Sequence, residues 1–332
     1  MIIALLLLVI GLALLVKGAD WLVDGSSSLA KRVGISDLTI GLTVVAFGTS
    51  MPELVVNVTS SLSGASDIAI GNVVGSNIAN ILLILGICAL ITNLSVQTST
   101  VWKEIPFALL ATVVLFFMAN DVLFDGYAVA ELGRSDGLIL ISFFFIFLWY
   151  IAGMGRADKP SEKDESIRIR GFWPSCGLVT AGLALLVGGG KLTVDGAVTI
   201  AQALGVSQAL IGFTIVAVGT SLPELATSVV AARKGRADIA VGNIVGSNIF
   251  NIFWILGVSA VIAPLPFQPA MNVDLLVTIG ATVLLFFAVH RGFPHKRLLF
   301  WKQKEKHTIE RIDGVLMLLA YAAYIAFLAM RG

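Results

Sequence analysis

The chain has 332 residues, of which 57% are hydrophobic and 13% are charged, and its mean hydropathy is +0.95. Soluble globular domains are roughly 25% charged, so this composition excludes an ordinary soluble protein. The formal net charge of +1 does not argue for nucleic acid, and we expect no nucleic-acid partner. The two cysteines, Cys88 and Cys176, form no metal or disulfide pattern.

Apolar segments of 18 or more residues recur along the whole chain, and each is long enough to cross a hydrocarbon core of ~30 Å. The first segment lacks the basic start of a signal peptide, so we interpret it as a span. The sequence therefore predicts an all-α membrane protein. Its ten transmembrane helices are expected near 2–24, 38–62, 70–91, 104–120, 136–154, 173–200, 207–231, 239–262, 272–290 and 312–330.

The distribution of Lys and Arg predicts the orientation of these spans. With the N-terminus outside, the inside connections carry 18 of the 22 basic residues. Cytoplasmic connections of membrane proteins hold such an excess. We therefore expect a multi-pass protein of the cell (inner) membrane with both termini outside, whose basic connector at 155–171 can touch anionic lipid.

A long internal repeat divides the chain. Residues 41–86 and 212–257 align without a gap at an offset of 171, and 27 of 46 positions are identical. Residues 1–154 and 172–332 then each hold five spans, joined by a cytoplasmic connector at 155–171. Because five is odd, the second copy is expected to enter the membrane upside down. Inverted repeats of this kind are typical of secondary transporters.

The first repeated motif predicts a broken helix at the membrane midplane in each half. It reads GTSMPE at 48–53 and GTSLPE at 219–224. Proline removes a backbone donor and glycine loosens the chain, so carbonyls near Ala46–Thr49 and Ala217–Thr220 should be freed. Each motif ends in a glutamate, Glu53 or Glu224, and an ionised acid at the centre of a span costs about 2.5–3.5 kcal/mol. Two such acids call for a compensating cation.

The second repeated motif supplies neutral oxygen ligands. It reads GNVVGSNIAN at 71–80 and GNIVGSNIFN at 242–251. Serine and asparagine four residues apart lie on one helix face, and the glycines four apart allow close helix approach. The residues in question are Ser76, Asn80, Ser247 and Asn251.

The motifs contain oxygen ligands but no His or Cys, which disfavours soft transition metals. Flexible carboxylates suit Ca²⁺, and the same oxygens can hold Na⁺. Two glutamates balance one Ca²⁺ or at least two monovalent ions, and the empty, charged site is costly to move past lipid. This competition predicts antiport, with no cofactor other than the transported ions.

The two motifs resemble the α-repeats of the cation/calcium antiporter superfamily, and most closely those of the prokaryotic sodium/calcium exchangers. The resemblance implies alternating access, with spans 1 and 6 sliding against the other eight. Some relatives carry Asp at the position of Asn251, so this chain has two acids in the site and potassium co-transport is not expected. The resemblance implies a Ca²⁺ site made by Glu53, Glu224, Thr49 and Thr220, flanking Na⁺ sites to which Ala46, Ser50, Ser76, Ala217, Ser221 and Ser247 contribute, and Asn80 and Asn251 at the border of the middle of the site.

Two other functions remain open at this stage. A Ca²⁺/H⁺ or Na⁺/H⁺ antiporter could use the same glutamates, because protonation also neutralises them. A cation channel also contains broken helices and acidic residues, although channels usually gather identical subunits around a pore. An enzyme is not expected, since the chain has neither HExxH nor GxSxG. The remaining charges within spans, Lys17, Asp20, Asp24, Lys191 and Asp195, are expected to snorkel or to form local ion pairs.

Overall fold

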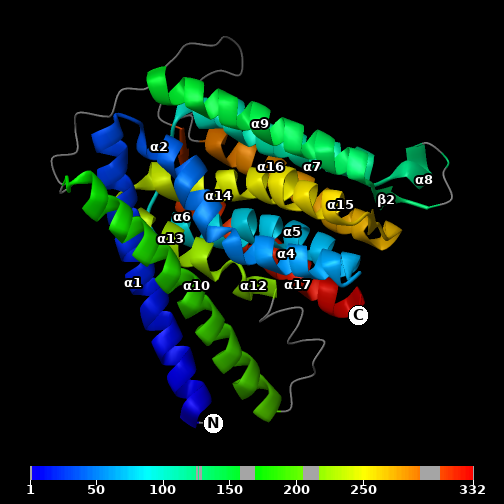
Figure 1. Cartoon of the computed structure of the whole chain (residues 1–332), viewed down its shortest axis with the longest axis horizontal. Coiled ribbons are helices and arrows are strands. Elements are labelled where there is room, and N and C mark those ends of the chain that lie inside the picture. The colour runs from blue at the N-terminus through cyan, green and yellow to red at the C-terminus, as the bar shows by residue number, and fades with distance from the viewer. Residues whose placement is uncertain are drawn as a thin grey trace.

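The computed structural model describes residues 2–124, 126, 129–157, 169–204, 217–291 and 307–331. These residues form a bundle of helices joined by short connections (Figure 1). The first half contains α1 Ile2–Val33, α2 Asp37–Ile40, η1 Gly41–Val45, α3 Ala46–Thr49, α4 Met51–Leu62, α5 Ser66–Ile78, η2 Ala79–Leu85, α6 Gly86–Ile91, η3 Thr100–Glu104, α7 Ile105–Met118, α8 Asp121–Phe124 and α9 Arg134–Ala157. The second half contains α10 Phe172–Ala203, α12 Ala217–Gly219, α13 Leu222–Arg233, α14 Ala237–Phe250, η5 Asn251–Leu256, α15 Gly257–Ile262, η6 Pro269–Met271, α16 Asn272–Arg291 and α17 Arg311–Arg331.

The protein has enough apolar helices to cross a membrane many times. Among the described residues, eight helices are long and apolar enough to span, and the bent pair 37–49 and 51–62 raises the number to nine. The first part of the predicted seventh span, 207–231, lies outside the described residues, and so does most of the connector predicted at 155–171. The chain is therefore a multi-pass membrane protein.

Two continuous helices form the centre of the bundle. In the most apolar window of Ser66–Ile91, 72% of the residues are buried, and in that of Ala237–Ile262 the share is 83%, against 28% for α1. Each central helix widens into π-helical turns, η2 and η5, at repeat-related positions. Such turns interrupt the regular bond pattern and are frequent at functional sites.

The GTSxPE motifs interrupt helices, as the sequence predicts. The axis bends by 46° between α3 and α4, where Ser50 has φ −82° and ψ 8°. In the second half Ser221 separates α12 from α13 with φ −88° and ψ 7°. Pro52 and Pro223 lie in the first turn of the helix that follows, where a missing N–H costs no helical bond.

Helices α1 and α10 pack closely and extend together past the rest of the bundle (Figure 1). A Cβ atom on Gly18 would lie 2.8 Å from the Gly182 carbonyl oxygen, and one on Gly189 would lie 2.8 Å from the Gly11 oxygen. Only glycine allows backbones to approach so closely. These glycines recur every seven residues and are repeat-related, since 11 + 171 = 182 and 18 + 171 = 189.

The connections are not entirely helical, which corrects the all-α prediction in detail. Antiparallel pairs join β1 Leu94–Val96 to β4 His307–Ile309 and β2 Glu131–Leu132 to β3 Leu265–Pro266. Backbone groups that leave a helix still need partners, and a neighbouring connection supplies them. Strands of two or three residues are too short to show an alternating sequence pattern.

The two halves are linked by reciprocal hydrogen bonds. Gln97 Nε2 donates to Asp238 Oδ2 over 2.7 Å, and Gln268 Nε2 donates to Asp67 Oδ2 over 2.6 Å. The second bond is the first with the halves exchanged, because 97 + 171 = 268 and 67 + 171 = 238.

Candidate functional site

The two motif glutamates are buried at the start of the helices that follow the breaks. Glu53 lies in the first turn of α4 and Glu224 in the first turn of α13, and each is 1% exposed. A helix N-terminus favours a negative group, because its unpaired N–H dipoles point toward it. The motif therefore combines the break, the dipole and the acid within six residues.

Each glutamate receives a hydroxyl from the other half of the chain. Ser50 Oγ donates to Glu224 Oε1 over 3.0 Å, and Ser221 Oγ donates to Glu53 Oε1 over 3.2 Å. The structure therefore brings the two broken helices together around both carboxylates, as the sequence predicts.

A serine of each central helix donates to Oε1, the same carboxylate oxygen that receives the hydroxyl from the other half. Ser76 Oγ donates to Glu53 Oε1 over 3.5 Å, and Ser247 Oγ donates to Glu224 Oε1 over 3.4 Å. These contacts are again repeat-related. Four serines predicted for the site thus all contact a glutamate.

Four buried oxygen atoms of the site have no hydrogen-bond partner among the described residues. They are Oε2 of Glu53, Oε2 of Glu224, Oδ1 of Asn80 and Oδ1 of Asn251. All four side chains are 1% exposed. A buried acceptor without a donor is costly, and a bound cation satisfies it. These four atoms form two pairs of repeat-related oxygens, the kind of ligand that hard cations prefer.

The predicted threonines contact asparagines of the second motif. Thr49 Oγ1 donates to Asn243 Oδ1 over 3.0 Å, and Thr220 Oγ1 donates to Asn72 Oδ1 over 3.3 Å. A hydroxyl that donates its proton keeps its lone pairs, so Thr49 and Thr220 can still ligate a cation through the hydroxyl or the backbone oxygen.

The two predicted alanines could contribute only through their backbone. The Ala46 carbonyl oxygen accepts from Ser50 N over 3.1 Å and from Thr49 Oγ1 over 3.3 Å, at the break itself. Ala217 begins α12, but its side chain lies outside the described residues.

Four asparagines of the second motif belong to the site although the sequence analysis did not single them out. Asn72 and Asn243 accept the threonine hydroxyls, and Asn77 and Asn248 bond to Asn251 and Asn80. The repeat contained the signal, because each of these amides is identical in both copies and lies within a predicted span.

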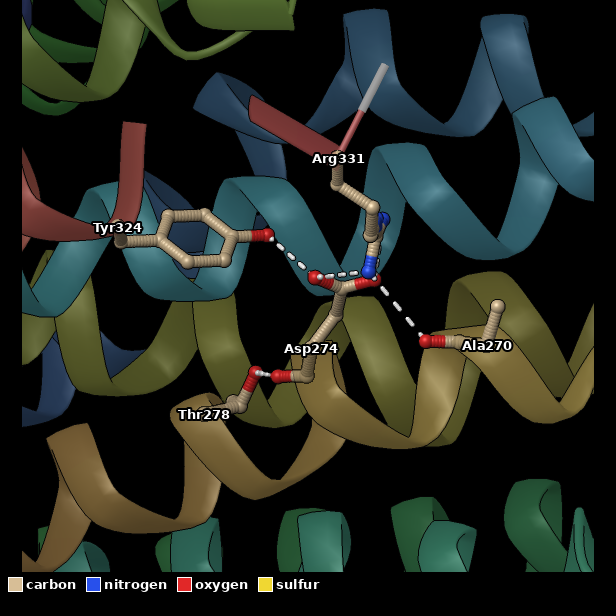
Figure 2. A network of polar contacts seen from close by, with 5 residues as sticks. All are labelled: Ala270, Asp274, Thr278, Tyr324 and Arg331. Carbon is tan, nitrogen blue, oxygen red and sulfur yellow. Dashed lines mark hydrogen bonds and ion pairs between the residues drawn. The ribbon is translucent and has the colours of Figure 1, made fainter. Parts of the chain in front are cut away.

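Another buried carboxylate, Asp274 on α16, is neutralised by the protein itself (Figure 2). Tyr324 Oη donates to its Oδ1 over 3.0 Å, and Arg331 Nη2 lies 3.0 Å from its Oδ2. Arg331 Nη1 also donates to the Ala270 carbonyl oxygen over 3.3 Å. This cluster joins α16 to α17 and needs no added cation.

The described histidines do not take part in the candidate site. His290 lies in the last turn of α16 and His307 begins β4, and the centroids of their rings lie 5.7 Å apart. Burial and the neighbouring His290 lower the pKa of the His307 imidazole. Among the described residues, no three His, Cys, Asp or Glu side chains gather as a metal site, so the candidate cation site has two acids and depends on neutral oxygens.

Comparisons with known proteins find relatives that match nearly the whole chain. The family described as "Sodium/calcium exchanger protein" matches residues 3–153 and 174–330. The chain is 35% identical over 360 aligned residues to the sodium/calcium exchanger MaX1 of Methanosarcina acetivorans, covering 97% of each chain. It is 38% identical to the inner membrane protein YrbG of Escherichia coli, covering 89% of this chain and 91% of that protein.

The fold is also similar to a solved structure. The sodium-calcium exchanger NCX_Mj superimposes with a TM-score of 0.81 and 34% identity, covering 98% of this chain and 99% of that one.

Proposed function

Because the chain belongs to the sodium/calcium exchanger protein family, we propose that it is a secondary antiporter that exchanges Ca²⁺ for Na⁺ across the membrane. Both ions bind in turn to the oxygens around Glu53 and Glu224. The observation that carries this proposal is the set of four buried, unpartnered oxygens, two from the glutamates and two from Asn80 and Asn251.

The exchange follows from charge. Two ionised glutamates inside a bilayer each cost about 2.5–3.5 kcal/mol when nothing balances them. One Ca²⁺ or two Na⁺ ions cancel both charges, so either load allows the site to pass between the two sides. The empty site keeps its charges, which makes movement without an ion costly and couples the two fluxes.

The ion site lies where two inverted repeats of five spans meet, at 1–154 and 172–332, joined by the connector at 155–171. The reciprocal bonds Gln97–Asp238 and Gln268–Asp67 support this arrangement. Ten spans place both termini outside the cell membrane, as the distribution of Lys and Arg requires. Alternating access then consists of α1 and α10 moving as one unit across the broken helices.

Flux measurements in proteoliposomes test this function. Vesicles loaded with Na⁺ and diluted into Na⁺-free buffer containing radioactive Ca²⁺ should accumulate Ca²⁺ at equal internal and external pH. Glu53→Gln and Glu224→Gln should each reduce this uptake to the level of empty vesicles, because one remaining carboxylate cannot balance Ca²⁺. Both variants should still elute as the intact protein.

Two results would reject the proposal. Uptake that follows a pH gradient but not a Na⁺ gradient would make the protein a proton-coupled antiporter. Wild-type uptake by either glutamine variant would remove that glutamate from the ion site.

A further inference from the structure

Four buried asparagines form a chain of hydrogen bonds where the central helices meet, in the order Asn80, Asn248, Asn77, Asn251. Asn80 Nδ2 donates to Asn248 Oδ1 and Asn251 Nδ2 donates to Asn77 Oδ1, each over 2.9 Å. Asn77 Nδ2 donates to the Asn248 carbonyl oxygen over 3.2 Å, and Asn248 Nδ2 donates to the Asn77 carbonyl oxygen over 3.3 Å. The chain of hydrogen bonds is therefore symmetric between the two halves.

The backbone carbonyls of Asn77 and Asn248 fix the orientation of every amide in this chain of hydrogen bonds. A carbonyl oxygen can only accept, so each of Asn77 and Asn248 must turn its NH₂ group toward it. The side-chain oxygen of Asn77 then faces Asn251, and that of Asn248 faces Asn80. Asn251 and Asn80 must therefore donate from their own NH₂ groups. As a result, Asn80 and Asn251 are left with free oxygens, and these are the unpartnered atoms of the site.

We propose that Asn77 and Asn248 are positioning residues that hold the amide oxygens of Asn251 and Asn80 toward the transported cation. This inference rests on the proposed function, because the cation is the one assigned to Glu53 and Glu224. An amide that turned over would present its NH₂ dipole to the ion and repel it. Asn77 and Asn248 exclude that orientation without touching the ion themselves.

Equilibrium Ca²⁺ binding to the purified full-length protein, measured by calorimetric titration with CaCl₂ in Na⁺-free buffer, tests the inference. Asn77→Leu removes the acceptor for Asn251 at nearly constant volume. Loss of a group that orients a metal ligand typically lowers affinity about 10–100-fold, so the Kd should rise by that factor. Asn120→Leu is the matched control, because it removes a part-buried amide pair, Asn120–Asn272, joined by bonds of 2.7 Å outside the site. Its Kd should stay at the wild-type value.

A double-mutant cycle separates positioning from simple packing. If Asn77 acts through Asn251, then Asn77→Leu should change the Kd of an Asn251→Leu protein less than about twofold. If the two substitutions instead raise the Kd by independent factors that multiply in the double mutant, the inference is overturned. An Asn77→Leu protein that binds Ca²⁺ like the wild type would also overturn it. Asn248→Leu with Asn80→Leu repeats the cycle in the other half should the first pair fail to fold.

The same titration distinguishes failure of the inference from failure of the proposed function. A wild-type protein that binds no Ca²⁺, or a Glu53→Gln protein that binds it normally, would reject the function and the inference together. Loss of binding in Glu53→Gln with an unaffected Asn77→Leu protein would reject the inference alone.

Discussion

Two buried carboxylates, Glu53 and Asp274, show the difference between a binding group and a structural one at the scale of residues. Asp274 has a guanidinium and a phenol on its oxygens. Glu53 receives only hydroxyls on one oxygen and nothing on the other, and no Lys or Arg of the described chain pairs with it. A cation or a proton from solution must therefore balance the charge of an ionised Glu53, and in the proposed function that role belongs to the transported ion.

The serines that cross between the halves should be equivalent in function. Ser50→Ala and Ser221→Ala each remove one hydroxyl from a buried carboxylate, a bond worth about 1.5–3 kcal/mol. We expect each variant to raise the Ca²⁺ concentration for half-maximal exchange by roughly 10–100-fold. Ser142→Ala is the control, because that hydroxyl lies on the exposed face of α9 and bonds to Leu138 O. A large effect of one crossing serine and none of the other would contradict the symmetry of the site.

At the scale of elements, the pair α1 and α10 carries the proposed motion. Ser28 Oγ and Ser175 Oγ lie 2.9 Å apart between these helices. In a background with Cys88→Ala and Cys176→Ala, the pair Ser28→Cys and Ser175→Cys should form a disulfide without strain. Exchange should survive oxidation, since the two helices keep their mutual contact throughout the cycle. Inactivation by oxidation that a reductant reverses would show that α1 and α10 move against each other.

The end of α13 holds α1 by ion pairs that the other half lacks. Lys234 Nζ lies 2.6 Å from Asp20 Oδ1 and 2.6 Å from Asp24 Oδ1, which agrees with the local ion pairing expected for these acids. The repeat-related position of Lys234 is Ser63, since 234 − 171 = 63. In the proposed orientation these pairs help to close the cytoplasmic side.

Lys234→Ser should therefore ease access from the cytoplasmic side. Partly exposed ion pairs contribute about 0.2–1 kcal/mol. The cytoplasmic Ca²⁺ concentration that gives half-maximal exchange in oriented vesicles should therefore fall by up to about fivefold. Lys17→Ser is the control, because Lys17 Nζ lies 3.7 Å from Asp20 and its side chain is 56% exposed. If Lys234→Ser leaves this Ca²⁺ concentration unchanged, these ion pairs have no role in closing the cytoplasmic side.

At the scale of the whole molecule, the sequence predicts the membrane class, the helix breaks and the grouping of the site because each depends on local rules. Proline breaks a helix, hydrocarbon penalises charge, and an identical motif folds identically. The hydrogen-bonded asparagines and the pairing of β1 with β4 depend on which segments meet in space, which one sequence does not state. The packing of α1 on α10 is predictable only in part. The repeated glycines are visible in the sequence, but the helix against which they pack is known only from the structure.

The proposed topology can be tested by labelling. A single cysteine at the exposed Glu131, in the connection between the predicted spans 104–120 and 136–154, should react with a membrane-impermeant maleimide in intact cells when the protein has no other cysteine. A cysteine at Arg233, in the connection proposed to lie inside, should react only after the cells are opened. Labelling of Arg233→Cys in intact cells would show that the orientation is the opposite of the proposed one.

The most direct measurement of the central claim is the position of a bound divalent ion. Crystals grown with Sr²⁺ in place of Ca²⁺ should give one strong anomalous peak in contact with Oε2 of both Glu53 and Glu224, at about the 2.3–2.6 Å typical of calcium–oxygen bonds or slightly longer. The peak should disappear in the Glu53→Gln protein. A Sr²⁺ peak elsewhere in the molecule, with none between the two glutamates, would contradict the account.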